Sequence, residues 1–284
     1  MKLFRRKPKI QRVGLALGGG GARGLAHIQV LESLDELGIR PYRMAGTSIG
    51  AVMAALYASG LSGKEMRKLA YQWQTPNPVK RHGLLDRHDL RRWAAMLDPS
   101  FDRSGLFKGE KIIHFLSDHI KCTTFEKLKI PLYVTAASYG DASEVVFKSG
   151  DLLSAVRASM AIPGVFTPVE RDGHLLLDGG VVNPLPYDLL QRECDLVIAV
   201  DVGGTRHVDE KHRPAFFDTV ISSFEIMEAS MIRYRLKANP PDIYLKPNIR
   251  NVGLLEFFKA DQIFEQSAGI KDELRAKLKM ILKM

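Results

Sequence analysis

The pentapeptide Gly46-Thr47-Ser48-Ile49-Gly50 stands where one apolar stretch, residues 42–45, gives way to another, residues 49–58. The first stretch predicts a short strand, and the second predicts a helix that ends at Gly60. Glycines at both ends of a Gly-x-Ser-x-Gly pentapeptide let the chain turn sharply from strand into helix, which holds the serine strained and exposed. The hydroxyl of Ser48 could then attack a carbonyl carbon, although so short a motif often arises by chance.

A glycine run, Gly18-Gly19-Gly20-Gly21, lies upstream of the pentapeptide. It follows residues 13–17, which predict a buried strand, and precedes residues 25–37, whose apolar positions recur at helical spacing. Backbone amides without side chains can approach a substrate closely, and the start of a helix adds the positive end of its dipole. The amide that follows the serine is a further donor in this kind of turn. The two motifs together predict a serine hydrolase with an oxyanion hole made by Gly19, Gly20, Gly21 and Ile49.

A nucleotide site is the competing interpretation of the glycine run. Gly19-x-Gly21-x-x-Gly24 between a strand and a helix matches the dinucleotide-binding fingerprint, which requires an acidic residue at the end of the second strand. That strand ends instead in the Ser48 pentapeptide. A Walker-type phosphate loop is excluded because Leu25 stands where a lysine should follow Gly24. We therefore expect no bound dinucleotide.

No histidine is a persuasive candidate for the base that would take the proton of Ser48. Of the eight histidines, His27 fits a packing role in its helix, and His207 and His212 lie in a charged loop. His174 is four residues from Asp178 on one predicted strand, which separates them by roughly 13 Å.

Asp178-Gly179-Gly180 is the better candidate for the base, because it ends the apolar strand 174–177. A carboxylate is a weak base unless burial raises its pKa, but within hydrogen-bond reach it could accept the proton during attack. Asp-Gly also commonly starts a turn with no chemical role. The residues alone leave these two interpretations even.

Composition is that of an ordinary globular enzyme. The chain has 284 residues, of which 45% are hydrophobic, and its net charge is +9. No apolar run reaches the ~18 residues of a membrane span, and the basic N-terminus is not a secretory signal, so we expect a cytoplasmic protein. Cys122 and Cys194 match no metal spacing. The scattered Lys and Arg residues lack a base-stacking aromatic motif, which argues against nucleic acid.

The order of predicted elements begins β-α-β-α, which predicts a parallel sheet covered by helices. Residues 62–128 lose the strand signal, and helical segments at 65–73, 89–97 and 110–120 predict a helical cap inserted into the core. A long amphipathic helix is expected at 215–237, with Phe217, Ile221, Phe224, Met227 and Met231 on one face. We expect a basic arm over 1–12, a catalytic domain over 13–250 and a C-terminal helical region over 251–284.

Four blocks in this order closely resemble the patatin-like phospholipase family. They are Gly19-Gly20-Gly21-Ala22-Arg23-Gly24, the Ser48 pentapeptide, Ala158-Ser159-Met160-Ala161-Ile162-Pro163 and Asp178-Gly179-Gly180. The resemblance implies a three-layer α/β/α fold with a mostly parallel central sheet and a helical cap insertion. It also implies a Ser48–Asp178 dyad without histidine and an oxyanion hole of glycine amides.

The resemblance further implies that Arg23 orients the glycine loop or meets developing charge, and that Ser159 and Pro163 shape the wall of the site. Its substrates would be acyl esters of phospholipids or other lipids, cleaved through an acyl-serine intermediate. We expect no metal and no cofactor. The basic N-terminus could touch an anionic membrane surface at the inner face of the membrane, although a solvated tail explains that arm slightly better.

Two other functions remain compatible with these residues. An acyltransferase or thioesterase would use the same acyl-serine with another acceptor or donor. A membrane-associated regulator would keep the fold but catalyse little turnover. The intact Ser48, Asp178 and glycine run argue against this function.

Overall fold

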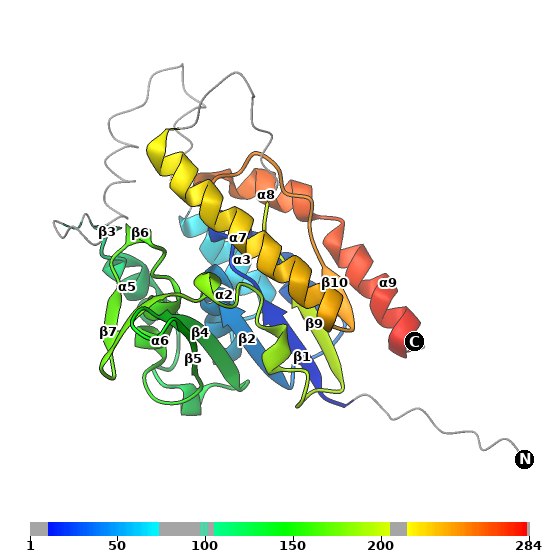
Figure 1. The fold of residues 1–284 in the computed structure, drawn as a ribbon. Helices are drawn as coiled ribbons and strands as arrows, with labels where there is room; N and C mark the ends of the chain where they lie inside the picture. Colours follow the sequence, from blue (N-terminus) through cyan, green and yellow to red (C-terminus); the bar gives the residue numbers. More distant parts are fainter. Residues whose placement is uncertain (1–10, 74–97, 99, 101–104, 205–214, 283–284) are drawn as a thin grey trace, which may run out of the picture.

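The structure is a computed structural model that describes residues 11–73, 98, 100, 105–204 and 215–282. The first ten residues of the predicted basic arm, the predicted helix at 89–97 and the predicted loop at 205–213 lie outside the described residues. Within the described part, the chain forms one eight-stranded sheet, a two-stranded sheet and helices on both faces of the larger sheet (Figure 1).

The main sheet has the order β10-β9-β1-β2-β4-β8-β7, and β5 pairs with β4. Its strands are β1 Val13–Leu17, β2 Arg43–Thr47, β4 Leu132–Ser138, β5 Ser143–Phe147, β7 Val169–Arg171, β8 His174–Asp178, β9 Leu196–Val200 and β10 Ile243–Leu245. The strands from β10 to β4 run parallel, whereas β5 and β8 are antiparallel to β4, and β7 is antiparallel to β8. The predicted mostly parallel central sheet is confirmed.

Helices cover the two faces of this sheet unequally. They are α1 His27–Glu36, α2 Ile49–Ser59, α3 Gly63–Trp73, α5 Glu110–His119, α6 Leu152–Ser159, α7 Phe216–Ala238, α8 Ala260–Ser267 and α9 Ile270–Leu282. Short 3₁₀ helices are η1 Gly21–Ala26, η2 Phe125–Lys127, η3 Gly179–Val181, η4 Tyr187–Leu189 and η5 Phe257–Lys259. Among the described helices, none combines the length and the apolar character needed to cross a membrane.

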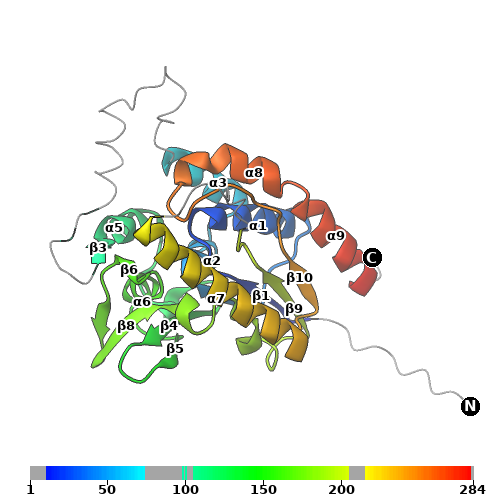
Figure 2. The ribbon, with the colours of Figure 1, turned by 45° about the horizontal axis from the view of Figure 1, so that its top comes forward.

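Alternation along β1 shows how the sheet divides the core into two layers. Leu15 and Leu17 point into the larger cluster, which includes residues of α1, α2, α8 and α9, while Ala16 points into a smaller cluster on the opposite face. That smaller cluster contains Tyr187 of η4 and Ile232 of α7. Figures 1 and 2 show α7 crossing the sheet on the face opposite α1. Helices, sheet and helices thus form the three predicted layers.

The register of three neighbouring strands brings two predicted site residues to one level. Thr47, the last residue of β2, pairs with Thr135 of β4, and the next residue of β4, Ala136, pairs with Asp178 of β8. Because β2 and the antiparallel β8 pair with consecutive parts of the same edge of β4, opposite β5, Ser48 follows β2 at the point where β8 ends. The glycine run follows β1, which is the other neighbour of β2.

The segment 62–128 differs in part from the sequence prediction. It contains a strand, β3 Gly105–Phe107, which pairs in parallel with β6 Gly164–Phe166. The strand is three residues long and pairs outside the main sheet, so it leaves no periodic signal. The predicted helices at 65–73 and 110–120 appear as α3 and α5, which pack on α1 and α6. The cap as a whole stays a prediction.

The inner face of α7 also differs from the prediction. Ile221 is buried as expected, but the side chain of Met227 is 57% exposed, and Ile232 is buried in its place. Each three-residue step turns the helix by 300°, so two such steps in succession move the predicted positions away from one face of the helix.

The C-terminal helices pack on the same core as α1, since Gln29 donates to the Phe264 carbonyl oxygen at 2.8 Å. The domain boundary at 250 stays a prediction.

Candidate active site

Ser48 occupies the turn between β2 and α2 in a conformation that few side chains adopt. Its φ is 55° and its ψ is −125°, in the region that favours glycine, which marks local strain. A methyl carbon added to Gly50 would overlap the Leu17 carbonyl oxygen, and one added to Gly46 would lie 2.7 Å from the Ala51 nitrogen. The two glycines of the pentapeptide therefore permit the close approach that the sharp turn requires.

The hydroxyl of Ser48 donates a hydrogen bond to Asp178. The distance from Ser48 Oγ to Asp178 Oδ2 is 2.6 Å, and the other carboxylate oxygen accepts from the Gly180 amide at 2.7 Å. Both side chains are buried. Burial raises the pKa of Asp178 to about 7, while the bonds from Ser48 and Gly180 act in the opposite direction. A carboxyl with this pKa can serve as a base near neutral pH.

The backbone under Ser48 is held by neighbouring polar side chains. The Ser48 amide donates to Ser159 Oγ at 2.9 Å, which links the turn to the end of α6. Thr47 Oγ1 donates to the Asn183 carbonyl oxygen at 2.7 Å and lies 2.6 Å from Thr135 Oγ1. These buried bonds fix the turn to β4, to the end of α6 and to the segment after η3, and they agree with the structural role that the resemblance implies for Ser159.

The glycine run presents its amides in two different ways. The Gly18 amide donates to the Val200 carbonyl oxygen at 3.0 Å, and the Gly19 amide donates to the Pro184 carbonyl oxygen at 3.0 Å. Gly19 was predicted as an oxyanion donor, but its N–H is already committed to the protein. Its role in the structure is to anchor the loop, and it leaves the set of donors.

The three remaining predicted donors are Gly20, Gly21 and Ile49. In the part of the chain that the structure describes, none of their amides has a hydrogen-bond partner. Gly21 has a φ of 57°, and a methyl carbon there would overlap the Leu254 carbonyl oxygen. A side chain at this position would therefore displace the loop.

Arg23 is buried, and its guanidinium binds two later segments of the chain. Its guanidinium donates to Glu225 Oε1 of α7 at 2.7 Å and to the Val252 carbonyl oxygen at 3.1 Å. It thereby ties η1 to α7 and to the loop before α8. These contacts fit the predicted orientation of the loop and leave contact with substrate charge as an expectation.

The described histidines do not join Ser48 and Asp178. His27 is fully buried, and its Nε2 lies 2.9 Å from the Gly18 carbonyl oxygen, so it orders the glycine run. Desolvation lowers the pKa of His27 to about 4, which keeps the ring neutral. His174 lies at the surface beside Asp141, with 3.2 Å between Nδ1 and Oδ2.

Two side chains of α7 reach this region without having been predicted as site residues. A methyl carbon added to Gly180 would overlap Glu228 Oε1 and would lie 3.1 Å from the Phe224 ring. No sequence motif marks Glu228, and α7 lies many residues after Asp178 in the chain. Only the amphipathic pattern of α7 could have indicated that this side of the helix faces the site.

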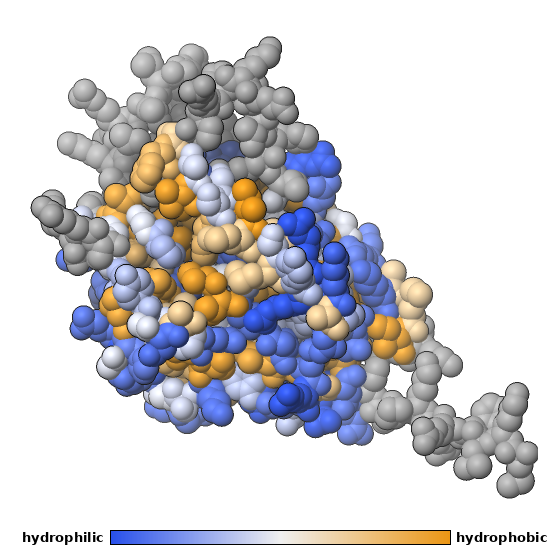
Figure 3. All heavy atoms as spheres, in the orientation of Figure 1, coloured by the Kyte–Doolittle hydropathy of each residue, from blue (hydrophilic) through white to orange (hydrophobic). Residues whose placement is uncertain are grey.

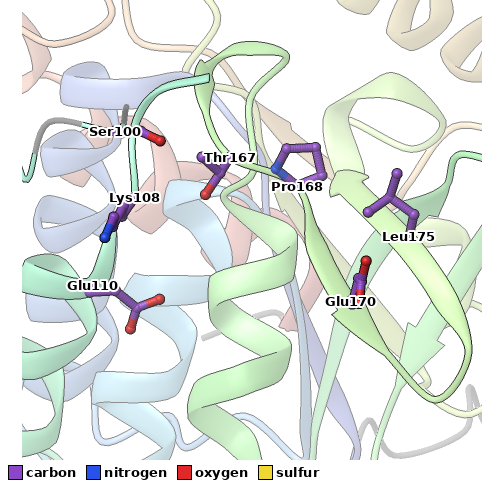
Figure 4. A pocket seen from close by; sticks show the side chains of 7 residues that line it. All are labelled: Ser100, Lys108, Glu110, Thr167, Pro168, Glu170 and Leu175. Atoms are coloured by element: carbon purple, nitrogen blue, oxygen red, sulfur yellow. The ribbon is translucent and has the colours of Figure 1, made fainter. Parts of the chain in front are cut away.

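A separate surface pocket of about 420 Å³ lies beside β7 and the start of α5 (Figure 4). Its lining contains neither Ser48 nor Asp178 and consists of Ser100, Lys108, Glu110, Thr167, Pro168, Glu170 and Leu175.

Within the described ranges, no group of three or more His, Cys, Asp or Glu side chains could hold a metal ion.

Comparison with known proteins finds one family. Residues 15–190 match the family model described as patatin-like phospholipase. An uncharacterized NTE family protein of Mycobacterium bovis is 40% identical over 195 residues, which cover 68% of this chain and 50% of that protein. The neuropathy target esterase sws of Drosophila melanogaster is 33% identical over 201 residues, which cover 69% of this chain and 13% of that protein.

Two further similarities extend over more of the chain. Lysophospholipase NTE1 of Kluyveromyces lactis is 27% identical over 281 residues, covering 90% of this chain and 18% of that protein. The crystal structure of VipD from Legionella pneumophila has a TM-score of 0.51 and 14% identity, covering 94% of this chain and 67% of that chain. The likeness to VipD concerns the fold alone. The chain spans half or less of the length of the curated relatives named here.

Proposed function

Because the chain belongs to the patatin-like phospholipase family, we propose that it is a serine lipid acyl hydrolase that cleaves phospholipid or lysophospholipid esters. The observation that carries the proposal is the 2.6 Å hydrogen bond from Ser48 Oγ to Asp178 Oδ2 at a strained turn. A hydroxyl bonded to a buried carboxylate, next to three unpaired amides, has the parts that acyl transfer requires.

The reaction then proceeds through an acyl-serine intermediate. Asp178 accepts the proton of Ser48 as Oγ bonds to the ester carbon, and the amides of Gly20, Gly21 and Ile49 stabilise the oxyanion. The carbon–oxygen bond of the leaving alcohol breaks, and that alcohol takes the proton from Asp178. Water then gives a proton to Asp178 as it attacks the acyl carbon. The bond between that carbon and Ser48 Oγ breaks, Asp178 returns the proton to Oγ, and the fatty acid leaves. No metal or cofactor takes part in these steps.

Labelling with a fluorophosphonate tests this proposal, because such a probe reacts with an activated serine. Mass spectrometry of the labelled protein should locate the probe on Ser48. The base must be ionised, so the labelling rate should fall as the pH drops through about 7, by about tenfold for each further pH unit. An unlabelled wild-type protein, or a probe on another residue, would contradict the proposal. Adding an alcohol to the lipid assay distinguishes hydrolysis from acyl transfer.

We further propose that the outer side of α7 contacts the lipid surface. Phe216, Val220, Met227 and Tyr234, which we call the outer stripe, recur at intervals of four and seven residues and so share one side of the helix. Their exposed fractions are 86, 42, 57 and 76%. Figure 3 shows apolar side chains over the first half of α7 on this face of the molecule, with polar side chains prevailing over the second half. Exposed apolar rows of this kind are typical of membrane contact.

A lipid surface fits the outer stripe for two reasons. Phe224 and Glu228 follow Val220 by four and eight residues, so they lie on the side of the helix that adjoins the stripe, and both are next to Gly180. A membrane at the stripe would therefore lie close to the Ser48–Asp178 pair. The helix also exposes Arg233 and Lys237, which would complement anionic headgroups.

Replacing Phe216 and Met227 by serine should weaken binding to vesicles that contain anionic lipid by about tenfold or more. Burying one such side chain contributes about 1.5–3 kcal/mol to the binding free energy, and about 1.4 kcal/mol corresponds to a factor of ten in affinity. Co-sedimentation with the vesicles measures the binding, and Ser223→Ala on the exposed side of α7 is the matched control. Unchanged binding of the double variant would refute the membrane role of the stripe.

A further inference from the structure

Glu228 places a second carboxyl group beside the Ser48–Asp178 pair. A methyl carbon added to Gly180 would overlap Glu228 Oε1 and would lie 3.1 Å from Asp178 Oδ1, so the two carboxyl oxygens are close neighbours. One added to Gly19 would lie 3.6 Å from the same Glu228 oxygen and 3.5 Å from Ser48 Cβ. The carboxyl therefore stands between the glycine run and the Asp178 loop, on the side of Ser48 that faces Gly19.

The charges around Glu228 offer it no counter-ion of its own. The groups that face it are Asp178, Arg23, Glu225 and Asp201. Arg23, the cation among them, is bonded to Glu225, and Asp201 is paired with Lys246 at 2.6 Å. Within the described chain, Glu228 takes part in no ion pair. An ionised Glu228 would thus be a second negative charge next to Asp178.

We propose that Glu228 is a further residue of the catalytic centre and that the reaction requires its carboxyl in the neutral, protonated form. This inference rests on the proposed hydrolase function. Attack by Ser48 creates a negative charge on the substrate oxygen while Asp178 takes up a proton. A neutral Glu228 leaves one negative charge in the centre throughout, whereas an ionised Glu228 would add another and oppose the oxyanion.

The order of ionisation follows from the contacts of the two carboxyls. Asp178 accepts bonds from Ser48 and Gly180, which favour its ionised form, and Glu228 has no such donors in the described chain. Burial raises the pKa of Glu228 well above its ordinary value, and the charge of Asp178 raises it further. As the pH rises, Asp178 therefore loses its proton first and Glu228 second. The active form, with Asp178 ionised and Glu228 neutral, exists between these two ionisations.

The pH dependence of fluorophosphonate labelling at Ser48 tests this role. We expect the wild-type rate to rise with the ionisation of Asp178 and to fall again at higher pH as Glu228 ionises. Glu228→Gln keeps the neutral shape permanently, so it should retain the rising limb and lose the falling one. Its rate relative to wild type should then grow by up to about tenfold per pH unit beyond the wild-type maximum. Asp218→Asn removes an exposed charge from the same helix and should keep both limbs.

A falling limb that stays in place in Glu228→Gln would overturn the inference while leaving the hydrolase function intact. A wild-type protein that is not labelled at Ser48 would overturn both. Should Glu228→Gln fail to fold, the ¹³C shift of the Glu228 carboxyl carbon in the wild-type protein decides the matter. A signal that titrates after that of Asp178 supports the proposal, and one that titrates at or below the ordinary glutamate pKa of about 4.3 refutes it.

Discussion

Ser48→Ala should lower the turnover of lipid esters by on the order of 10⁶-fold, to the rate that the rest of the site supports. The substitution removes the atom that would form the acyl intermediate and leaves Asp178 without the proton it would accept. Release of fatty acid from lysophospholipid in detergent micelles measures the effect. The variant should also take up no fluorophosphonate.

A surface serine provides the matched control for this loss. Ser117 lies exposed on α5, where its hydroxyl donates to the His114 carbonyl oxygen, so Ser117→Ala should retain wild-type turnover. Thermal melting of both variants checks that the fold survives. If Ser48→Ala kept more than about a tenth of the activity, the nucleophile would have to be another residue.

Asp178→Asn should cost nearly as much as the loss of the nucleophile, because Asp178 is the base of the pair. The amide has almost the same shape, and its oxygen can still accept from the Gly180 amide. It cannot take up the proton of Ser48, so the attacking oxygen would stay protonated. We expect the double variant Ser48→Ala with Asp178→Asn to be no slower than either single variant, since the two residues act as one unit.

Steady-state rates of the two single variants and the double variant measure this non-additivity. Asp172→Asn, at an exposed aspartate whose side chain is 78% accessible, is the matched control and should leave the rate unchanged. Full activity of Asp178→Asn together with its loss in a histidine variant would replace the dyad by a triad. Effects of the two residues that multiply in the double variant would show that they act independently.

The sequence predicted most of the fold because the signals were local. The pentapeptide around Ser48, the glycine run and the apolar strands 13–17 and 132–137 each depend on residues that are neighbours in the chain. Period, turn chemistry and glycine content are properties of such short segments. The strand β3 escaped prediction because three residues that pair outside the main sheet carry too little pattern.

The candidate site was predictable only as far as its residues follow strands. Ser48 ends β2 and Asp178 ends β8, and they are 130 residues apart in the chain, yet the shared partner β4 sets them at one level. The sequence by itself left Asp178 even between a base and a turn. The resemblance favoured the base, and the strand register explains how the two side chains can meet.

The amino-acid sequence by itself determined the sharp turn at Ser48 and the side-chain-free loop of the glycine run. Only the tertiary structure decided that the Gly19 amide is committed to Pro184, that Arg23 reaches Glu225 across 202 residues, and that Glu228 faces Asp178. The physical reason is that a turn is fixed by the φ and ψ of adjacent residues, whereas hydrogen-bond partners and charge neighbours depend on how distant segments pack. No local pattern records that packing.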